Sequence, residues 1–456
     1  LYGRLADAEG LAAARRFAGE VLAVLVLSLL VTVILGELLM PWLVRVLASG
    51  FAPGSEQHRL AVELSRLTFP FILFVSLAAM VSGVLQAAHR FVAAALAPVL
   101  LNLVLILALL LTGAVGELAA RLLAGCVTLA GLLQLLWVLA AARRAGLAPR
   151  LVKPRLSPAV RRLLGLMAPG LLGVGVVQVN ILVSSWFATH LPAGTVAYLF
   201  YADRLVQLPL GIVGVALGTA LLPALSRAAH RGGAAHTLLN RAMELALLLS
   251  LPAAAGLWLL ADPIIAVLFE RGAFGPEATR ATAQVLAGLA LGLPAYVLAK
   301  VLAPGFFAVE DTRTPVRIAI VALLVNIAGA WLFAGALAHL GLALALSLAS
   351  WVNALGLAAV LWRRGVLAPD RGLLRRGVGT LGAVLVMGGV LAAGRASIDG
   401  HSIAALAAAV PRSVALWLLR TPWKAPTGVR TADTMYTGST MVGRMSYDLR
   451  VFRCPP

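Results

Sequence analysis

Long apolar runs recur along the chain and limit what it can fold into. A helix that crosses the hydrocarbon core of a bilayer needs roughly 20 mostly apolar residues. These runs are too long for transmembrane barrel strands, which need only about 10 alternating residues each. The sequence therefore predicts an all-α polytopic membrane protein with about twelve spans. The runs lie at residues 21–43, 68–88, 91–113, 122–141, 167–189, 197–222, 242–260, 282–307, 315–337, 341–362 and 377–394, with a weaker one at 403–419.

Charge is sparse and is concentrated in particular connections between these runs. The chain is 61% hydrophobic and 12% charged, whereas a soluble domain carries about 25% charged residues. The formal net charge of +19 could suggest nucleic-acid binding, but in a membrane protein the distribution of basic residues indicates orientation instead. We therefore expect a lipid bilayer and no nucleic acid as partner, with the basic connections on the cytoplasmic side. Arginine and lysine gather in every second connection, within residues 1–16, near 90, and within 142–166, 227–241, 313–317 and 363–376.

A repeated order of landmarks relates two halves of the chain. Six spans separate equivalent landmarks, so both copies are expected to cross the membrane in the same direction. Repeats of this kind are related by an axis along the membrane normal, as in parallel-repeat transporters. The sequence thus predicts two parallel-repeat six-helix lobes around a cavity, plus two C-terminal helices. Pro41, Gly54, Pro70, Gly83, Arg90 and Asn102 recur in order as Pro263, Gly275, Pro294, Gly305, Arg313 and Asn326.

The repeat also predicts the domain organisation. The second copy opens with the runs at 167–189 and 197–222, whose counterparts would precede residue 1, so the first lobe is expected to lack its first two helices. The tail has a composition unlike the rest of the chain, and either a disordered segment or a reading-frame change near residue 410 would explain it. The expected units are an incomplete N-lobe (1–141), a basic cytoplasmic linker (142–166), a C-lobe (167–362), two additional C-terminal helices with the second truncated (363–419) and an atypical polar tail (420–456).

The stretch 200–223 combines an apolar run with polar residues on one side. At 100° per residue, Arg204, Gln207, Gly211, Gly214 and Gly218 share one arc of about 80°, with Asp203 at its edge. Ionisable residues within spans are rare and usually line a pathway, while glycines let a helix or a bulky ligand approach the backbone closely. We therefore expect this face to line the cavity. The alternative is an interfacial acid and base that mark the end of the span.

Two further polar residues are candidates for the cavity. Lys300 either lines the cavity or extends its amine toward the cytoplasmic surface. Asn180 either lines the cavity or forms a hydrogen bond between helices. The repeat-related Asn102 and Asn326 are expected to connect helices rather than to bind a ligand.

Sequence motifs of catalysis are missing. The chain has no G-x-x-x-x-G-K-[ST] loop for ATP, no H-E-x-x-H for zinc and no G-x-S-x-G elbow, and its histidines and cysteines lack metal-ligand spacing. We accordingly expect no catalytic residue, metal or cofactor. A transporter of this kind would draw on a coupling ion or the membrane potential. A membrane-embedded enzyme would normally place clustered acids in a cytoplasmic loop, and the basic loops hold almost none.

Two stretches resemble a known family. "YADRLVQLPLGIVGVALGTALLPALSR" at 201–227 resembles the signature of the MurJ/MviN family of lipid II flippases, and "APGFFAVEDTRTPVRIAIVALLVNI" at 303–327 is similar to a second stretch of that family. The resemblance implies a fourteen-helix, MATE-like fold and a transporter rather than an enzyme. Such a protein moves the undecaprenyl-pyrophosphate-linked peptidoglycan precursor, lipid II, across the bacterial inner membrane by alternating access. The family's cavity arginines bind the pyrophosphate, and this role transfers to Arg204, with Asp203 as its counter-ion.

Other functions remain open at this point. The nearest is an ion-coupled exporter of drugs or polysaccharide units from the same superfamily. A cationic-drug exporter would need uncompensated acids in its cavity, and the spans offer chiefly Asp203. A lipid-phosphate enzyme embedded in the membrane, or a scaffold that does not transport, would share the same hydropathy profile.

Overall fold

A computed structural model describes residues 2–3, 8, 10–113, 116–149, 152–215, 235–309, 311–368 and 371–397. Every regular element in these ranges is a helix, as the sequence predicts. Seven helical segments among the described residues are long and apolar enough to cross a membrane, and two of them, Glu56–Ala87 and Pro276–Phe307, each join two consecutive helices.

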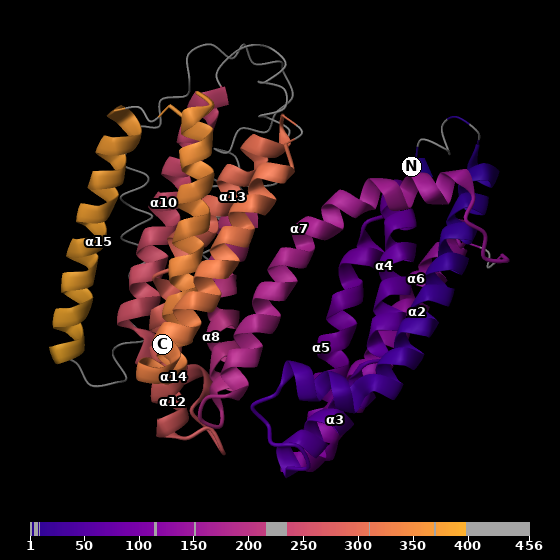
Figure 1. Ribbon diagram of the computed structural model, residues 1–456, viewed down its shortest axis with the longest axis horizontal. Coiled ribbons are helices and arrows are strands. Elements are labelled where there is room, and N and C mark those ends of the chain that lie inside the picture. Colours follow the sequence, from indigo (N-terminus) through magenta and orange to yellow (C-terminus); the bar gives the residue numbers. More distant parts are fainter. Residues whose placement is uncertain are drawn as a thin grey trace, which may run out of the picture. The chain divides into compact units, whose positions relative to one another are not determined.

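The first group of helices is drawn in indigo and purple in Figure 1. It contains α2 (Leu11–Leu47), α3 (Glu56–Thr68), α4 (Phe71–Ala87), α5 (Val92–Thr112) and α6 (Gly116–Arg144). Helices α3, α4 and α5 all pack against α6, and α2 contacts α3 and α4. Local signals set several of the ends. The Ser55 side chain accepts a hydrogen bond from the His58 N–H at the start of α3, and Gly113 ends α5 in the left-handed conformation that favours glycine.

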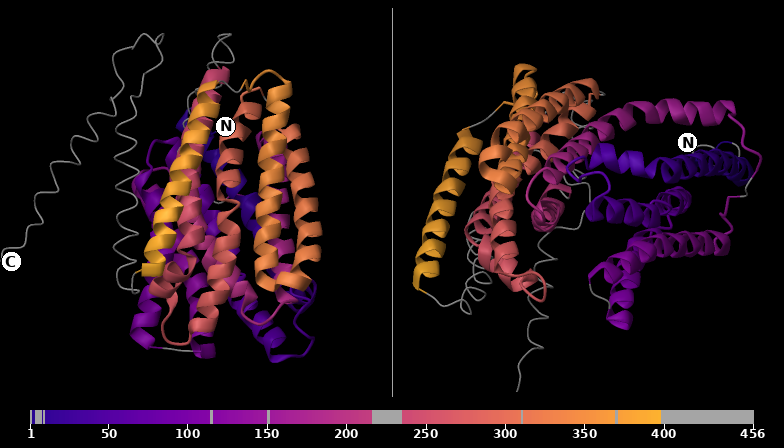
Figure 2. Two further views of the ribbon diagram at one scale, coloured as in Figure 1. Left: turned by 90° about the vertical axis from the view of Figure 1, so that its left-hand side faces the viewer. Right: turned by 60° about the horizontal axis from the view of Figure 1, so that its bottom comes forward.

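The second group begins with a long helix that connects it to the first group. It contains α7 (Pro158–Thr189), α8 (Thr195–Pro209), the π-helix η1 (Leu210–Val215), α10 (Ala235–Leu259), α11 (Ala261–Phe269), α12 (Pro276–Ala290), α13 (Leu293–Phe307), α14 (Arg313–Arg363) and α15 (Arg371–Ser397). Helix α7 contacts α2 of the first group and α14 of the second. Helix α8 packs on α12, while α13 packs on α10, η1 and α14. Helix α15 lies along α10 and appears in yellow at the left-hand side of the group in the right view of Figure 2.

Both groups contain the same helix break. The predicted spans 68–88 and 282–307 each correspond to parts of two consecutive helices, α3 with α4 and α12 with α13. Pro70 precedes the first turn of α4, and Pro294 lies in the first turn of α13, where proline's missing N–H costs no hydrogen bond. We propose that α2–α6 and α10–α14 are the two repeat copies. In that correspondence α5 and α6 match the two halves of α14.

Two other predicted boundaries differ from the structure. The separate spans at 315–337 and 341–362 form one element, α14, with a sharp corner at Ala338 (φ 46°, ψ −125°). The span at 197–222 changes from α-helix to π-helix at Leu210. Residues 216–222, the weak run at 403–419 and the tail at 420–456 lie outside the described residues.

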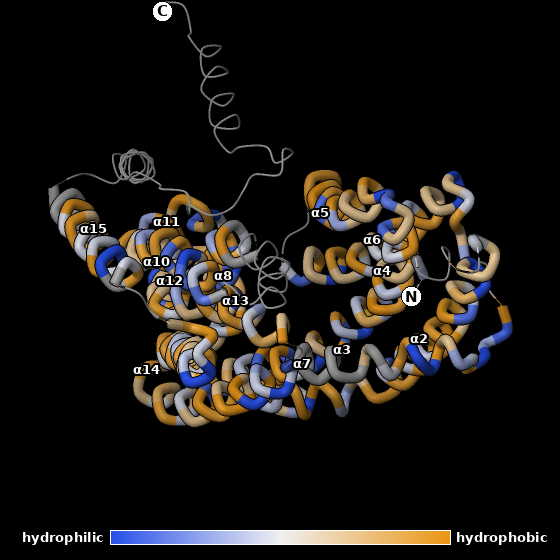
Figure 3. Tube along the Cα trace, turned by 90° about the horizontal axis from the view of Figure 1, so that it is seen from above, coloured by the Kyte–Doolittle hydropathy of each residue, from blue (hydrophilic) through white to orange (hydrophobic). Residues whose placement is uncertain are grey.

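Large apolar side chains cover the outside of the helices, as expected for contact with lipid. Figure 3 shows long hydrophobic stretches along most helices. On α2, for example, Leu27, Val31, Ile34 and Leu38 are all exposed. The α12–α13 pair differs, because 72% of its most apolar window is buried, against 22% for α3–α4. Helices α8, α10 and α14 surround α12 and α13, which places this pair at the centre of the second group.

Small residues allow α12 and α14 to approach closely. A Cβ added at Gly288 would lie 2.8 Å from the Ala343 Cβ, and one at Gly292 would lie 2.9 Å from the Ser347 Cα. The Ser347 hydroxyl donates to the Gly288 carbonyl at 2.7 Å. Because lipid gives helices no hydrophobic reason to associate, close packing and interhelical hydrogen bonds of this kind hold them together.

Candidate functional site

Helix α8 presents one buried face and one polar face. Ala202, Leu205 and Val206 are buried, and α8 packs against α12. Asp203, Arg204 and Gln207 are exposed on the other side, as the helical spacing predicts. Helix α8 starts at Thr195, so Arg204 lies nine residues further on, about 14 Å along the axis. That is about half the thickness of the hydrocarbon core, which favours a location inside the membrane over an interfacial one.

The side chains of Asp203 and Arg204 each bind a partner on their own helix. The Gln207 amide donates to the Asp203 carboxylate, and the Arg204 guanidinium lies over the Phe200 ring, 4.7 Å from its centroid. Neighbouring residues on a helix do not face each other, whereas residues four apart do. Among the described residues, Arg204 forms no ion pair within 4.0 Å. Asp203 and Arg204 therefore do not form a direct ion pair in this structure, although their charges still interact, and the role of Asp203 as a counter-ion stays a prediction.

The polar helix ends in an irregular segment. Pro209 is followed by the six-residue π-helix η1, which contacts α10 and α13. Proline removes an N–H and disturbs the α-helical hydrogen bonds, and single π turns of this kind are frequent at functional sites. Gly211 is exposed in this segment. The spacing of 100° per residue belongs to an α-helix and does not apply to the π-helix from Leu210 to Val215. The position of Gly214 on the polar face therefore stays a prediction, and Gly218 lies outside the described residues.

Lys300 is on a different part of the second group. It is exposed on α13, whose neighbouring residues Val297, Leu298, Val301 and Leu302 are buried. Helix α13, which carries Lys300, packs against η1, whereas α8 packs mainly against α12. Among the described residues, Lys300 makes no ion pair within 4.0 Å. The structure thus joins Asp203, Arg204 and Gln207 into one cluster and leaves Lys300 as a separate cation.

Asn180 connects two helices. Its Oδ1 accepts a hydrogen bond of 2.8 Å from the Nδ2 of Asn326 on α14, and the same Nδ2 donates to the Ser184 Oγ at 3.2 Å. Asn326 is almost fully buried, whereas its repeat counterpart Asn102 is exposed. Asn180 is expected from the sequence either to line the cavity or to form a hydrogen bond between helices, and the structure shows the hydrogen bond, between α7 and α14.

A cavity adjoins the start of α8, and its lining includes none of the residues that the sequence predicts for the transport cavity. It has a volume of about 440 Å³ and is lined by the end of α7, the start of α8 and Phe51 from the first group. Phe200, which lies under the Arg204 guanidinium, is part of its lining. An aromatic residue four positions before an arginine on a helix is a usable signal for this stacking, but the contribution of Phe51 depends on the tertiary fold.

Comparison with known proteins identifies the family. The model of the family described as lipid II flippase MurJ matches residues 2–407. The chain belongs to the MurJ family. The probable lipid II flippase MurJ of Rhizobium tropici is 45% identical over 397 residues, which cover 86% of this chain and 74% of that protein. The lipid II flippase MurJ of Burkholderia cenocepacia is 36% identical over 357 residues, or 77% of this chain and 69% of the relative.

Solved structures show that the MurJ-family chain shares its fold with a wider group of transporters. A lipid II flippase MurJ in an inward closed conformation matches with a TM-score of 0.75 at 22% identity, covering 89% of this chain and 84% of that one. A multidrug resistance MATE family transporter in an inward-facing conformation matches with a TM-score of 0.66 at 17% identity, covering 80% and 84%. The MATE-like fold expected from the sequence is confirmed, and this MurJ-family chain is a multi-pass membrane protein.

Proposed function

We propose that this chain translocates lipid II across the bacterial inner membrane during cell wall synthesis. Its MurJ-family relatives are named as lipid II flippases. The observation in the structure that supports the proposal best is Arg204, an exposed guanidinium on a membrane helix with no carboxylate oxygen within 4.0 Å among the described residues. A fixed cation of this kind suits an anionic group that must pass through the membrane.

The chemistry of the substrate explains why an arginine is needed. Moving a pyrophosphate through a hydrocarbon core is very costly unless cations accompany it. Arginine binds phosphate oxygens through two parallel, charge-assisted hydrogen bonds. The contact of Arg204 with Phe200 is worth only about 0.5–2 kcal/mol, so a phosphate group can replace it. The Gln207 amide meanwhile donates a hydrogen bond to the Asp203 carboxylate. This contact orients the carboxylate toward Gln207, which reduces its repulsion of the incoming anion.

The proposed transport is non-covalent and works by alternating access. The protein binds the head group between its two lobes, and the energy comes from a coupling ion or the membrane potential. No residue is assigned a catalytic role. The isoprenoid chain stays in the bilayer while the charged head group passes along the polar face of α8.

The test is substitution of Arg204 in bacteria depleted of their own flippase. Removing such a contact in a poorly solvated cavity should cost about 2–5 kcal/mol, which is at least a tenfold loss of affinity. Arg204→Ala should abolish growth and lipid II translocation while the protein still accumulates in the membrane. Arg204→Lys should be impaired, because a lysine point charge does not reproduce the two-pronged contact.

Matched variants separate this function from the alternatives. Arg45→Ala removes an exposed arginine at the end of α2 and should leave translocation intact. Asp203→Asn should be milder than Arg204→Ala if the carboxylate serves only as a compensating charge. A drug exporter would show the opposite order, with Asp203 essential and Arg204 dispensable. Normal lipid II translocation by Arg204→Ala would overturn the proposed role of Arg204.

A further inference from the structure

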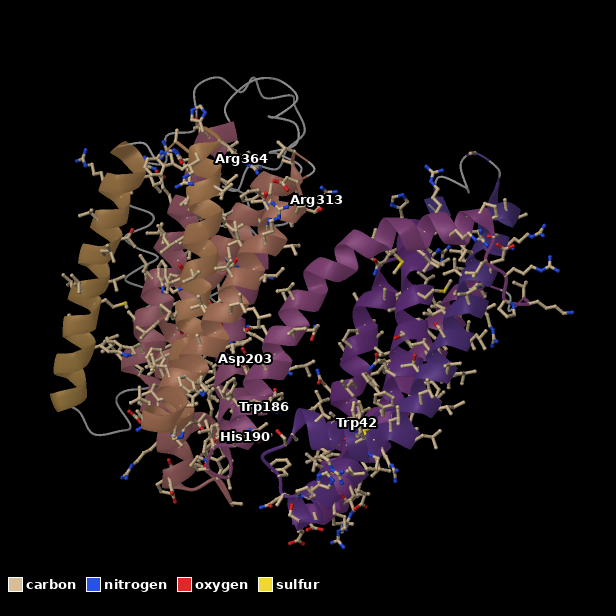
Figure 4. All side chains as sticks on the ribbon, viewed as in Figure 1. Trp42, Trp186, His190, Asp203, Arg313 and Arg364 are labelled. Carbon is tan, nitrogen blue, oxygen red and sulfur yellow. The ribbon has the colours of Figure 1, made fainter. Side chains whose placement is uncertain are left out.

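The turn after α2 contacts the end of α7. The Gly50 N–H donates to the Thr189 hydroxyl at 3.2 Å, and the Ser49 Oγ lies 3.3 Å from the His190 Nε2. The other ring nitrogen of His190, Nδ1, lies 2.9 Å from the Trp186 carbonyl. Figure 4 shows His190 near the end of the second group opposite to Arg313 and Arg364. This contact therefore lies on the side away from the basic connections.

The contact depends on the absence of a side chain at residue 50. An ideal Cβ on Gly50 would overlap the backbone carbonyl of Thr189 and come within 2.6 Å of the His190 nitrogen. Both groups belong to the main chain, so no rotation of a side chain could relieve the overlap. The two segments can approach this closely only because residue 50 is glycine.

Packing behind the contact is incomplete. The 440 Å³ cavity lies directly beside it and is lined by Phe51, Thr189 and Phe200 among others. The cavity is partly open rather than an enclosed void, and elements that move in function have few buried contacts. The junction of the two segments is thus held by two polar contacts and one close backbone approach, beside an open cavity.

We infer that Ser49 and Gly50, closed against Thr189 and His190, form an outer latch that must part for a head group to leave the protein. The inference rests on the proposed transport function, because it takes the two helix groups to separate on the outer side. Gly50 acts as a positioning residue in this latch, and Ser49 with His190 supplies its polar contact. When the latch parts, the partly open cavity beside Phe200 widens on the outer side, next to Arg204.

Cross-linking in the full chain tests the latch. Ser49→Cys and His190→Cys are introduced together after Cys126→Ala and Cys454→Ser, and a short thiol-cleavable bifunctional reagent joins them. The cross-link should form readily, stop lipid II translocation and be reversed by a reductant. Adding Gly50→Ala should lower the yield of the cross-link severalfold, because the two segments can no longer close. Peptide mass spectrometry measures the yield.

Gly83→Ala is the matched control, because a Cβ there meets no atom within 4 Å, and its yield should equal that of the parent. Translocation at the full rate while cross-linked, or an unchanged yield with Gly50→Ala, would overturn the latch. The yield needs no substrate. If the parent fails to translocate lipid II but its yield still depends on Gly50, the closed contact stands and the proposed function fails.

Discussion

Two arginines of the second group both lie over a phenylalanine ring but differ in their contact with a carboxylate. Arg364 donates to the Asp311 carboxylate at 2.7 Å and to the Thr314 hydroxyl at 3.0 Å, and it lies over the Phe306 ring. Asp311 also accepts hydrogen bonds from the Arg313 and Thr314 N–H groups at the start of α14. These contacts keep the pKa of Asp311 well below its usual range, chiefly through the Thr314 hydrogen bonds. Arg364 is thus committed to structure, whereas Arg204 is not.

The charge of Asp311 should stabilise the protein at every pH above its ordinary pKa of about 3.9. Asp311→Asn should lower the free energy of unfolding by about 0.5–1 kcal/mol, a modest cost because the Arg364 side chain is 41% exposed and exposed ion pairs contribute little. Since the folded pKa is depressed, the difference should be constant from pH 8 to 5 and shrink as the pH falls below about 4. Thermal unfolding in detergent across this range measures it. A difference that grows in acid would contradict the assignment.

The sequence predicts which residues share the polar face of α8, but it does not predict which partners their side chains contact. Arg204 and Gln207 share the exposed side of α8 because the α-helical period holds from 195 to 209. The hydrogen bond from Gln207 to Asp203 is not among the predicted contacts, although residues four positions apart on a helix face each other. The partner of Asn180 is Asn326, 146 residues away, and no local pattern could indicate it.

At the scale of elements, proline alone does not predict where a helix breaks. Pro70 and Pro294 accompany breaks, yet Pro41, Pro98 and Pro252 lie within continuous helices. Neighbouring helices in a membrane can satisfy the backbone groups that a proline frees. The outcome therefore depends on packing: a disturbed helix at Pro209 is expected from the proline itself, but its π-helical form is not.

The π turn offers a test of whether α8 must bend during transport. Gly211 has room for a methyl group, and replacing glycine by alanine within a helix stabilises it by about 0.5–1 kcal/mol. Gly211→Ala should raise thermal stability yet slow lipid II translocation, because the segment loses its freedom to change between helical forms. Gly256→Ala on α10, which also has room, should raise stability without slowing transport. Equal transport rates for the two variants would argue against a hinge.

At the scale of the whole molecule, the distribution of arginine predicts which side each connection occupies. Single cysteines replacing Arg155, Ala193 and Arg363, all exposed, can be placed in a chain that carries Cys126→Ala and Cys454→Ser. An impermeant thiol reagent applied to intact cells should label position 193 and leave 155 and 363 unlabelled until the cells are opened. Labelling in the reverse pattern would invert the orientation.

The corner at Ala338 has a practical consequence for engineering the protein. The two halves of α14 meet there without a loop, and a Cβ on Gly341 would overlap the Phe333 carbonyl. Exposed turns tolerate inserted segments, whereas tightly packed backbone does not. An epitope or a fluorescent domain placed at 338 would force the two halves of α14 apart. The exposed turn at Gly272, where the backbone is also left-handed but a Cβ meets nothing, is the better insertion point on the same side of the membrane.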